Sequence, residues 1–152
     1  SDVYKRQVYL ENKKKLFCII YCMNLIKILT AENENNVEIY NLLEKLFKII
    51  ELDNWLVEFL YLELNILKSI GYDINFKDYV INKSINGQSK YIVNSNQKII
   101  PNFLIDKNIG PENLKDIYNG FTIVGDFLDK TIIKPNNKNY PSSRNDFVNL
   151  LK

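Results

Sequence analysis

The residues of this chain that could do chemistry are few, and the least expected of them is a carboxylate, Glu63. The sequence contains no histidine and only two cysteines, Cys18 and Cys22. Acid–base catalysis at neutral pH most often uses histidine, and a structural zinc ion normally takes four cysteine or histidine ligands. A hydrolase that used Glu63 with Asp73 or Asp78 would also lack a nucleophile elbow, a phosphate loop and a metal set. The sequence therefore predicts a protein that is not an enzyme and holds no metal ion or cofactor.

Glu63 lies on the apolar stripe of a predicted helix. Phe59 and Leu60 precede it by one turn, and Ile66 and Leu67 follow it by one turn, so its carboxylate should be buried. A buried carboxylate is costly unless it is paired or hydrogen-bonded. We therefore predict a structural role for Glu63, in which it caps a helix end or pairs with a lysine between packed helices.

Cys18 and Cys22 lie one turn apart on the same face of a predicted helix. Two cysteines at this spacing cannot easily form a disulfide without distorting the helix. We interpret them as buried free thiols in a reducing compartment. The alternative is that they supply two ligands of a metal site that another chain completes.

The densest basic group in the C-terminal third of the chain consists of Lys130, Lys134, Lys138 and Arg144. Lys130 and Lys134 are four residues apart on one helix face, and arginine suits bidentate recognition of carboxylates or phosphates. These four residues are the predicted surface for a protein partner or DNA. The alternative is an ordinary solvated face with a helix-terminus charge, and the run from Lys13 to Lys15 is interpreted as the polar start of a helix.

Three amphipathic helices are predicted in the first half of the chain. The first spans Lys13 to about Thr30, the second follows the acidic segment TAENENN, and the third begins at Asp53 as N-cap and ends at Gly71. Short links between them indicate an antiparallel cluster. The predicted buried stripes of the first two helices are Leu16, Ile19, Ile20, Met23, Ile26 and Leu29, and Val37, Tyr40, Leu43, Phe47 and Ile50.

The helical period fails in the middle of the chain, so residues 71–109 are predicted to be a loop and β insert. Asn86-Gly87 between two β-like runs predicts a hairpin, with a third short run in KIIPN. Helical spacing resumes after Pro111 and ends before Pro135, and Ser142 and Ser143 are the expected N-caps of a last helix. The predicted fold class is mainly α, an antiparallel helical cluster with a small β-hairpin or meander insert.

The bulk composition fits a single domain. The chain has 152 residues, of which 46% are hydrophobic, and a net charge of +2, so it is no polycation. We expect one helical domain over residues 10–152, with residues 1–9 a cloning scar or the remnant of an upstream linker. No apolar run reaches the ~20 residues that a membrane span needs.

The segment FLYLELNILKSIGY of the third helix carries an aromatic residue, Glu-Leu, spaced aliphatic residues and then Gly-Tyr. In this order it resembles a helix of the bacterial recombination mediator RecO. The segment DINFKD, the hairpin YIVNSNQKII, and the series from Phe127 through Pro135 and Pro141 to Arg144 are similar to the segments that follow in the family. The resemblance covers about residues 10 to 152 and implies the family's helical C-terminal domain, without its N-terminal OB-fold.

The resemblance also implies a function. RecO-type proteins are DNA repair and recombination mediators that bind the acidic, phenylalanine-ended tail of the single-strand DNA-binding protein (SSB) and single-stranded DNA. With a RecR-type mediator they assist recombinase loading and strand annealing, so a cytoplasmic, nucleoid-associated location is expected. The alternative is a generic helical protein-interaction domain with no nucleic-acid role, whose groove accepts a partner helix.

One segment departs from the pattern of many family members. Where they place a four-cysteine zinc motif, this chain has Tyr79 and, three residues later, Asn82. In this respect it resembles the alphaproteobacterial branch, whose loop is held without metal. We expect Tyr79 to pack into the space that the zinc site would occupy.

Overall fold

A computed structural model describes residues 1–29 and 36–152 of the chain. Its helices are α1 (Asp2–Leu29), α2 (Asn36–Ile49), α3 (Trp55–Ser69), α4 (Leu114–Leu128) and α5 (Ser142–Asn149). A three-stranded antiparallel sheet, β1 (Val80–Ile85), β2 (Gln88–Val93) and β3 (Ile99–Ile100), lies between α3 and α4 in the sequence. Short 3-10 turns at Phe76–Tyr79 and Asn102–Leu104 flank the sheet, and a π-helical turn at Asp129–Ile133 extends α4. The predicted fold class, mainly α with a β insert, is therefore confirmed.

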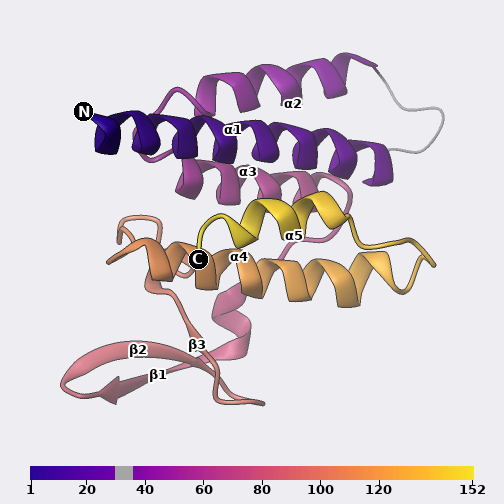
Figure 1. Cartoon of the computed structure of the whole chain (residues 1–152). Helices are drawn as coiled ribbons and strands as arrows, with labels where there is room; N and C mark the ends of the chain where they lie inside the picture. The colour runs from indigo at the N-terminus through magenta and orange to yellow at the C-terminus, as the bar shows by residue number, and fades with distance from the viewer. Residues whose placement is uncertain (30–35) are drawn as a thin grey trace.

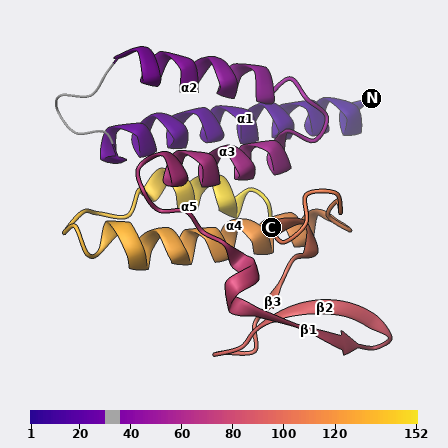
Figure 2. The same ribbon diagram turned by 180° about the vertical axis from the view of Figure 1, so that it is seen from behind.

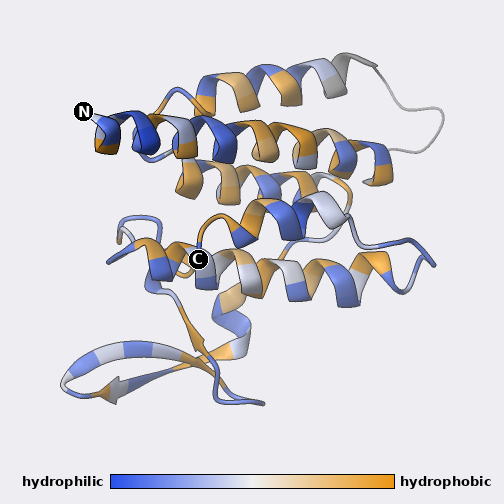
Figure 3. Ribbon diagram, in the orientation of Figure 1, coloured by the Kyte–Doolittle hydropathy of each residue, from blue (hydrophilic) through white to orange (hydrophobic). Residues whose placement is uncertain are grey.

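The helices lie side by side in layers, and the β insert projects from one side of them. Helices α1, α2 and α3 alternate in direction, α4 lies beyond α3, and α5 returns antiparallel to α4 beside α1 (Figure 1). The view from behind shows the hairpin of β1 and β2 standing clear of the helices (Figure 2). Hydrophilic residues predominate in this hairpin, whereas hydrophobic residues run along the helices (Figure 3).

The core is centred on three phenylalanines that come from three different helices. Phe59 of α3 lies 6.0 Å from Phe121 of α4 and 5.7 Å from Phe147 of α5, measured between ring centroids, and Phe121 lies 5.4 Å from Phe147. Tyr21 of α1 meets the edge of Phe59 at 6.0 Å. Because aromatic rings bury large areas and prefer such stacked and edge-to-face contacts, this cluster ties α1, α3, α4 and α5 into one core.

The buried face of α1 matches the prediction only in part, since Ile26 is buried and Ile19 is partly buried as predicted. The side chains in the core are Cys18, Tyr21, Cys22, Leu25 and Ile26. In contrast, Leu16, Ile20 and Met23 of the predicted stripe are 54%, 44% and 46% exposed. Apolar residues occur on both sides of this helix, so their period could not determine which side faces the core. The predicted break after the helix and the side chain of Leu29 lie outside the described residues.

The prediction for α2 was also wrong in part. Tyr40 and Phe47 are exposed, whereas Leu46, which the predicted stripe omitted, is fully buried. Ile50 is buried and Leu43 is partly buried, as predicted, and the side chain of Val37 lies outside the described residues.

The turns follow the local sequence signals closely. Gly71 has φ +99°, its N–H donates to the carbonyl of Lys68, and the N–H of Tyr72 donates to that of Leu67, which is the Schellman arrangement. Asn86 and Gly87 have φ +51° and +78°, as a type I′ hairpin turn requires.

The N-caps of α3 and α5 lie within a residue or two of the predicted positions, whereas α1 begins well before its predicted start. The N-cap of α3 is Asn54, not Asp53, and α5 begins at Ser142 with Pro141 as its N-cap. Residues 2–9, which the sequence separated as a remnant, continue α1.

Candidate protein-docking site

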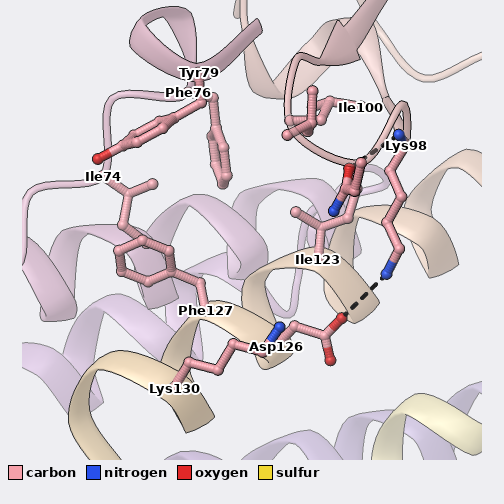
Figure 4. A pocket seen from close by; sticks show the side chains of 11 residues that line it. Ile74, Phe76, Tyr79, Lys98, Ile100, Ile123, Asp126, Phe127 and Lys130 are labelled. Carbon is pink, nitrogen blue, oxygen red and sulfur yellow. Dashed lines mark hydrogen bonds and ion pairs between the residues drawn. The ribbon is translucent and has the colours of Figure 1, made fainter.

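An apolar slot lies between the β insert and α4 (Figure 4). It encloses about 250 Å³. Its apolar walls are Ile74, Phe76, Tyr79, Val93, Ile100, Ile123 and Phe127, and its polar rim is Asn96, Lys98, Asp126 and Lys130. The slot thus combines aromatic walls with two ammonium groups at its edge.

The turn between β2 and β3 carries one of these ammonium groups. The N–H of Val93 donates to the carbonyl of Lys98 at 2.8 Å, which closes the turn, and Gln97 adopts φ +59° within it. The Nζ of Lys98 then lies 3.8 Å from Oδ2 of Asp126 on α4, across the mouth of the slot (Figure 4). Both side chains are more than half exposed, so this ion pair is weak and can open.

Lys130 carries the other ammonium group of the rim. It follows Asp126 by one turn, at the point where α4 passes into its π-helical extension. Phe127 lies between them in sequence and contributes to the slot wall. The same turn of α4 therefore supplies an apolar wall and a cation.

The structure does not bring the four predicted basic residues together on one surface. Of them, only Lys130 lines the slot. Lys134 is exposed and pairs with Asp129, with 3.0 Å between Nζ and Oδ2, and Lys138 is exposed in the loop before α5. Arg144 is 2% exposed and points into the core instead of toward a partner. It therefore cannot act as a surface cation.

The guanidinium of Arg144 forms an ion pair with the carboxylate of Glu63. Its Nη2 donates to Oε1 of Glu63 at 2.8 Å and to the carbonyl of Phe121 at 2.8 Å, while its Nε donates to Oε2 of Glu63 at 3.0 Å. The hydroxyl of Tyr21 also donates to Glu63, and Nη1 of Arg144 donates to the hydroxyl of Tyr140 at 3.1 Å. The buried carboxylate thus pairs with an arginine and not with the lysine expected from the sequence.

The surroundings of Arg144 and Tyr21 determine the protonation states of these two side chains. Burial alone would lower the pKa of Arg144, but the adjacent carboxylate of Glu63 raises it well above its usual range. Burial, then the charge of Glu63, raises the pKa of the Tyr21 hydroxyl well above its usual range. Arg144 therefore stays charged and Tyr21 keeps its proton near neutral pH, so neither of these two groups exchanges protons there.

The side chain of Tyr79 is mostly exposed and is not packed into the protein interior as expected. Its side chain is 58% exposed at the edge of the slot, and Phe76, one 3-10 turn earlier, is the residue that is buried there. Asn82 lies on β1, where its side-chain oxygen accepts a hydrogen bond from Ser89. Among the described residues, no three or more Cys, His, Asp or Glu side chains are grouped so that they could hold a metal ion.

The sequence did not indicate two parts of the slot. Lys98 appeared only as the polar start of a short β run, and nothing local showed that this turn reaches α4. The sequence predicts a loop, and not a helical turn, at Phe76. Lys98 and Phe76 line the slot together with residues of α4, which are distant from them in sequence. Helical or strand periodicity could not have revealed this.

Comparison with known proteins determines the family. The family model described as Recombination protein O C terminal matches residues 10–113, which is more than half of the chain. The chain belongs to the recombination protein O family. The resemblance to RecO is therefore confirmed, and it supports a role in DNA repair and recombination.

A curated relative agrees with this assignment. The chain is 26% identical over 125 residues to the DNA repair protein RecO of Ehrlichia chaffeensis, in an alignment that covers 74% of this chain and 49% of the relative. The chain thus spans about half the length of this RecO protein. No solved structure matches the chain. Among the described helices, none is long and apolar enough to cross a membrane.

Proposed function

We propose that this chain forms the helical part of a DNA repair and recombination mediator that works by binding and catalyses no covalent step. Its partners are the C-terminal tail of SSB and single-stranded DNA, with a RecR-type mediator as a further partner in the intact protein. Residues 10–152, including the insert at 71–109, act as one unit, in the nucleoid of the cytoplasm. The observation that carries the proposal is the apolar slot with Lys98 and Lys130 at its rim.

The slot suits an acidic peptide that ends in phenylalanine. A terminal ring needs an apolar cavity walled by aromatic and aliphatic groups, which Phe76, Ile123 and Phe127 provide. The carboxylates of the tail need cations nearby, which Lys98 and Lys130 provide. Each exposed charge contact is weak, so the ring supplies most of the affinity and the lysines supply orientation and salt dependence.

Binding of single-stranded DNA is expected to be electrostatic. Lys134 and Lys138 lie exposed near the end of α4 and in the loop after it, where they can contact phosphates. Contacts of this kind release counterions, so the affinity should fall steeply as salt rises. A complex with DNA that is insensitive to salt would contradict this part of the proposal.

The slot is tested by titrating the chain into a fluorescently labelled acidic peptide that ends in phenylalanine and following anisotropy. We expect saturable binding that weakens about tenfold or more when the terminal phenylalanine is removed. Lys130→Glu should also weaken binding, by a smaller factor, because each exposed charge contact is weak. Lys134→Glu is the matched control, because Lys134 lies one turn further along and pairs with Asp129 outside the slot. Equal losses from the two variants, or equal affinity for the shortened peptide, would show that the tail does not bind in the slot.

A further inference from the structure

Helix α1 carries an exposed apolar row on the side opposite the core. The row consists of Tyr9, Lys13, Leu16, Ile20, Met23 and Lys27, at alternating spacings of four and three residues. This spacing keeps side chains in one line along a helix and is that of the contact line between paired helices. Leu16, Ile20 and Met23 form its centre, and about half of each side chain is exposed.

The opposite side of α1 is already occupied by the rest of the fold. Cys18, Tyr21, Cys22 and Leu25 are fully buried, and Asn24 at the border of the row donates to Ser143 of α5. A helix that is apolar on both sides is typically buried on both sides. The row therefore has the composition of a contact surface, although the fold itself leaves it exposed.

The charge of α1 determines what kind of partner fits this row. The cations of the helix are Lys5, Arg6, Lys13, Lys14, Lys15 and Lys27, whereas its only carboxylates are Asp2 and Glu11. Glu11 is not free to balance the row, because it pairs with Lys14 at 3.2 Å and accepts a hydrogen bond from Trp55 at 3.2 Å. The row thus has an apolar centre with a cation on either side of it, Lys13 before and Lys27 after.

A second copy of the chain fits this row poorly. Lys13 and Lys27 lie equally far from Ile20 in sequence, so an antiparallel pair centred on Ile20 would set Lys13 against Lys27 of the other copy. Like charges held opposite each other oppose such pairing. A partner with carboxylates opposite Lys13 and Lys27 would instead be attracted by both lysines.

We propose that the outer row of α1 is a docking surface for an acidic amphipathic helix of another protein, which seats its apolar line on Leu16, Ile20 and Met23 and its carboxylates beside Lys13 and Lys27. This surface belongs to α1 and is distinct from the slot between the insert and α4. The two surfaces can therefore be tested separately.

The probe is a synthetic heptad peptide with isoleucine and leucine at its apolar positions and glutamate at the flanking positions. The control peptide has lysine at the flanking positions. Each is labelled and titrated with the 152-residue chain while anisotropy is followed. We expect the acidic peptide to bind at least about tenfold more tightly than the basic one, with an affinity that falls as salt rises.

Two variants of α1 test whether the acidic peptide binds at the row. Ile20→Glu should weaken binding of the acidic peptide about tenfold or more, because it sets a carboxylate at the centre of the contact. Leu10→Glu is the matched control, since Leu10 is 42% exposed on the same helix but lies outside the row. Both positions are exposed, so circular dichroism should show both variants folded. Ile20→Glu should leave binding of the phenylalanine-ended peptide unchanged, which separates this proposal from that of the slot.

Three results would overturn the proposal. The first is equal binding of the acidic and basic peptides, or of neither. The second is equal loss of binding in Ile20→Glu and Leu10→Glu. The third is a dimer of the chain in sedimentation equilibrium that Ile20→Glu dissociates, since the occupant of the row would then be a second copy.

Discussion

Glu63 and Arg144 are 81 residues apart in the sequence and meet in the core through two hydrogen bonds of 2.8 and 3.0 Å. The pair joins α3 to α5, and the carbonyl of Phe121 and the hydroxyls of Tyr21 and Tyr140 extend the network to α1, α4 and the loop before α5. Because both side chains are almost completely buried, neither can be solvated if the other is lost.

Removing one partner of this pair should be strongly destabilising. Glu63→Leu or Arg144→Met is expected to lower the free energy of unfolding by about 3–5 kcal/mol, because each leaves an uncompensated buried charge. The double variant Glu63→Leu/Arg144→Met should lose much less than the sum of the single losses. Urea denaturation followed by circular dichroism measures these values.

An exposed ion pair provides the control for this measurement. Lys68 and Asp73 lie 3.9 Å apart with both side chains mostly exposed, so Lys68→Met should change stability by no more than about 0.5 kcal/mol. Strictly additive losses in the double variant would show that Glu63 and Arg144 do not act as a pair.

Gly125 makes room for the guanidinium of Arg144. A Cβ at this position would lie 2.3 Å from Nη1 of Arg144 and 2.9 Å from the hydroxyl of Tyr140. Gly125→Ala should therefore displace both groups and destabilise the protein by about 1–3 kcal/mol, despite the better helix propensity of alanine. Gly110→Ala is the control, because nothing lies within 4 Å of a Cβ there. If Gly125→Ala and Gly110→Ala unfold at the same temperature in thermal melts, this role of Gly125 is contradicted.

The elements that the sequence predicted best are those set by neighbouring residues. The stop of α3 at Gly71 and the turn at Asn86-Gly87 each depend on a residue that tolerates positive φ, and such signals are local. The order of helices and the β insert followed from the change of period along the chain. The buried position of the Glu63 side chain follows from the same periodicity.

What the sequence could not determine depends on contacts between distant segments. The outer side of α1 has as regular an apolar period as the inner side, and the inner one is recognised by contacts with distant segments, such as those of Tyr21 with Phe59 and Glu63. An arginine can lie on the surface or in the core, and the sequence around Arg144 does not show which. The carboxylate that pairs with Arg144 in the core is 81 residues away. Lys98 joins the slot through the turn after β2, which no local pattern places against α4.

Stability should fall at alkaline pH because of the buried thiols. Burial, then the charge of Glu63, raises the pKa of Cys22 from 9.0 to about 12, and burial also raises that of Cys18. Below the pKa of the unfolded state, the Cys22 thiol is protonated in both the folded and the unfolded protein. Its contribution to the free energy of unfolding is therefore fully present there. Between about pH 9 and 12 the unfolded state loses the proton first, and the free energy of unfolding should fall by about 1.4 kcal/mol per pH unit from Cys22.

The variant Cys22→Ala tests the contribution of this thiol. It should be less stable than the parent at neutral pH because it leaves a small cavity, yet its stability should fall less steeply as pH rises. Cys18 and Tyr21 remain in the variant with raised pKa values, so some slope should persist. Urea denaturation at a series of alkaline pH values measures the slopes. A parent whose stability is constant over this range would show that the thiols ionise as freely in the folded state as in the unfolded state.

Asp126 should weaken binding of an acidic tail to the slot. Its carboxylate lies at the rim, 3.8 Å from Nζ of Lys98, where it partly neutralises that lysine and repels incoming carboxylates. Asp126→Asn removes the charge with little change of shape and should tighten binding of the phenylalanine-ended peptide roughly two- to fivefold, since an exposed charge contact contributes about 0.5–1 kcal/mol. The gain should shrink as salt rises. Asp129→Asn is the control, because Asp129 pairs with Lys134 away from the slot and should leave the affinity unchanged. A titration in which both variants tighten binding equally would point to the net charge of the chain and not to the rim of the slot.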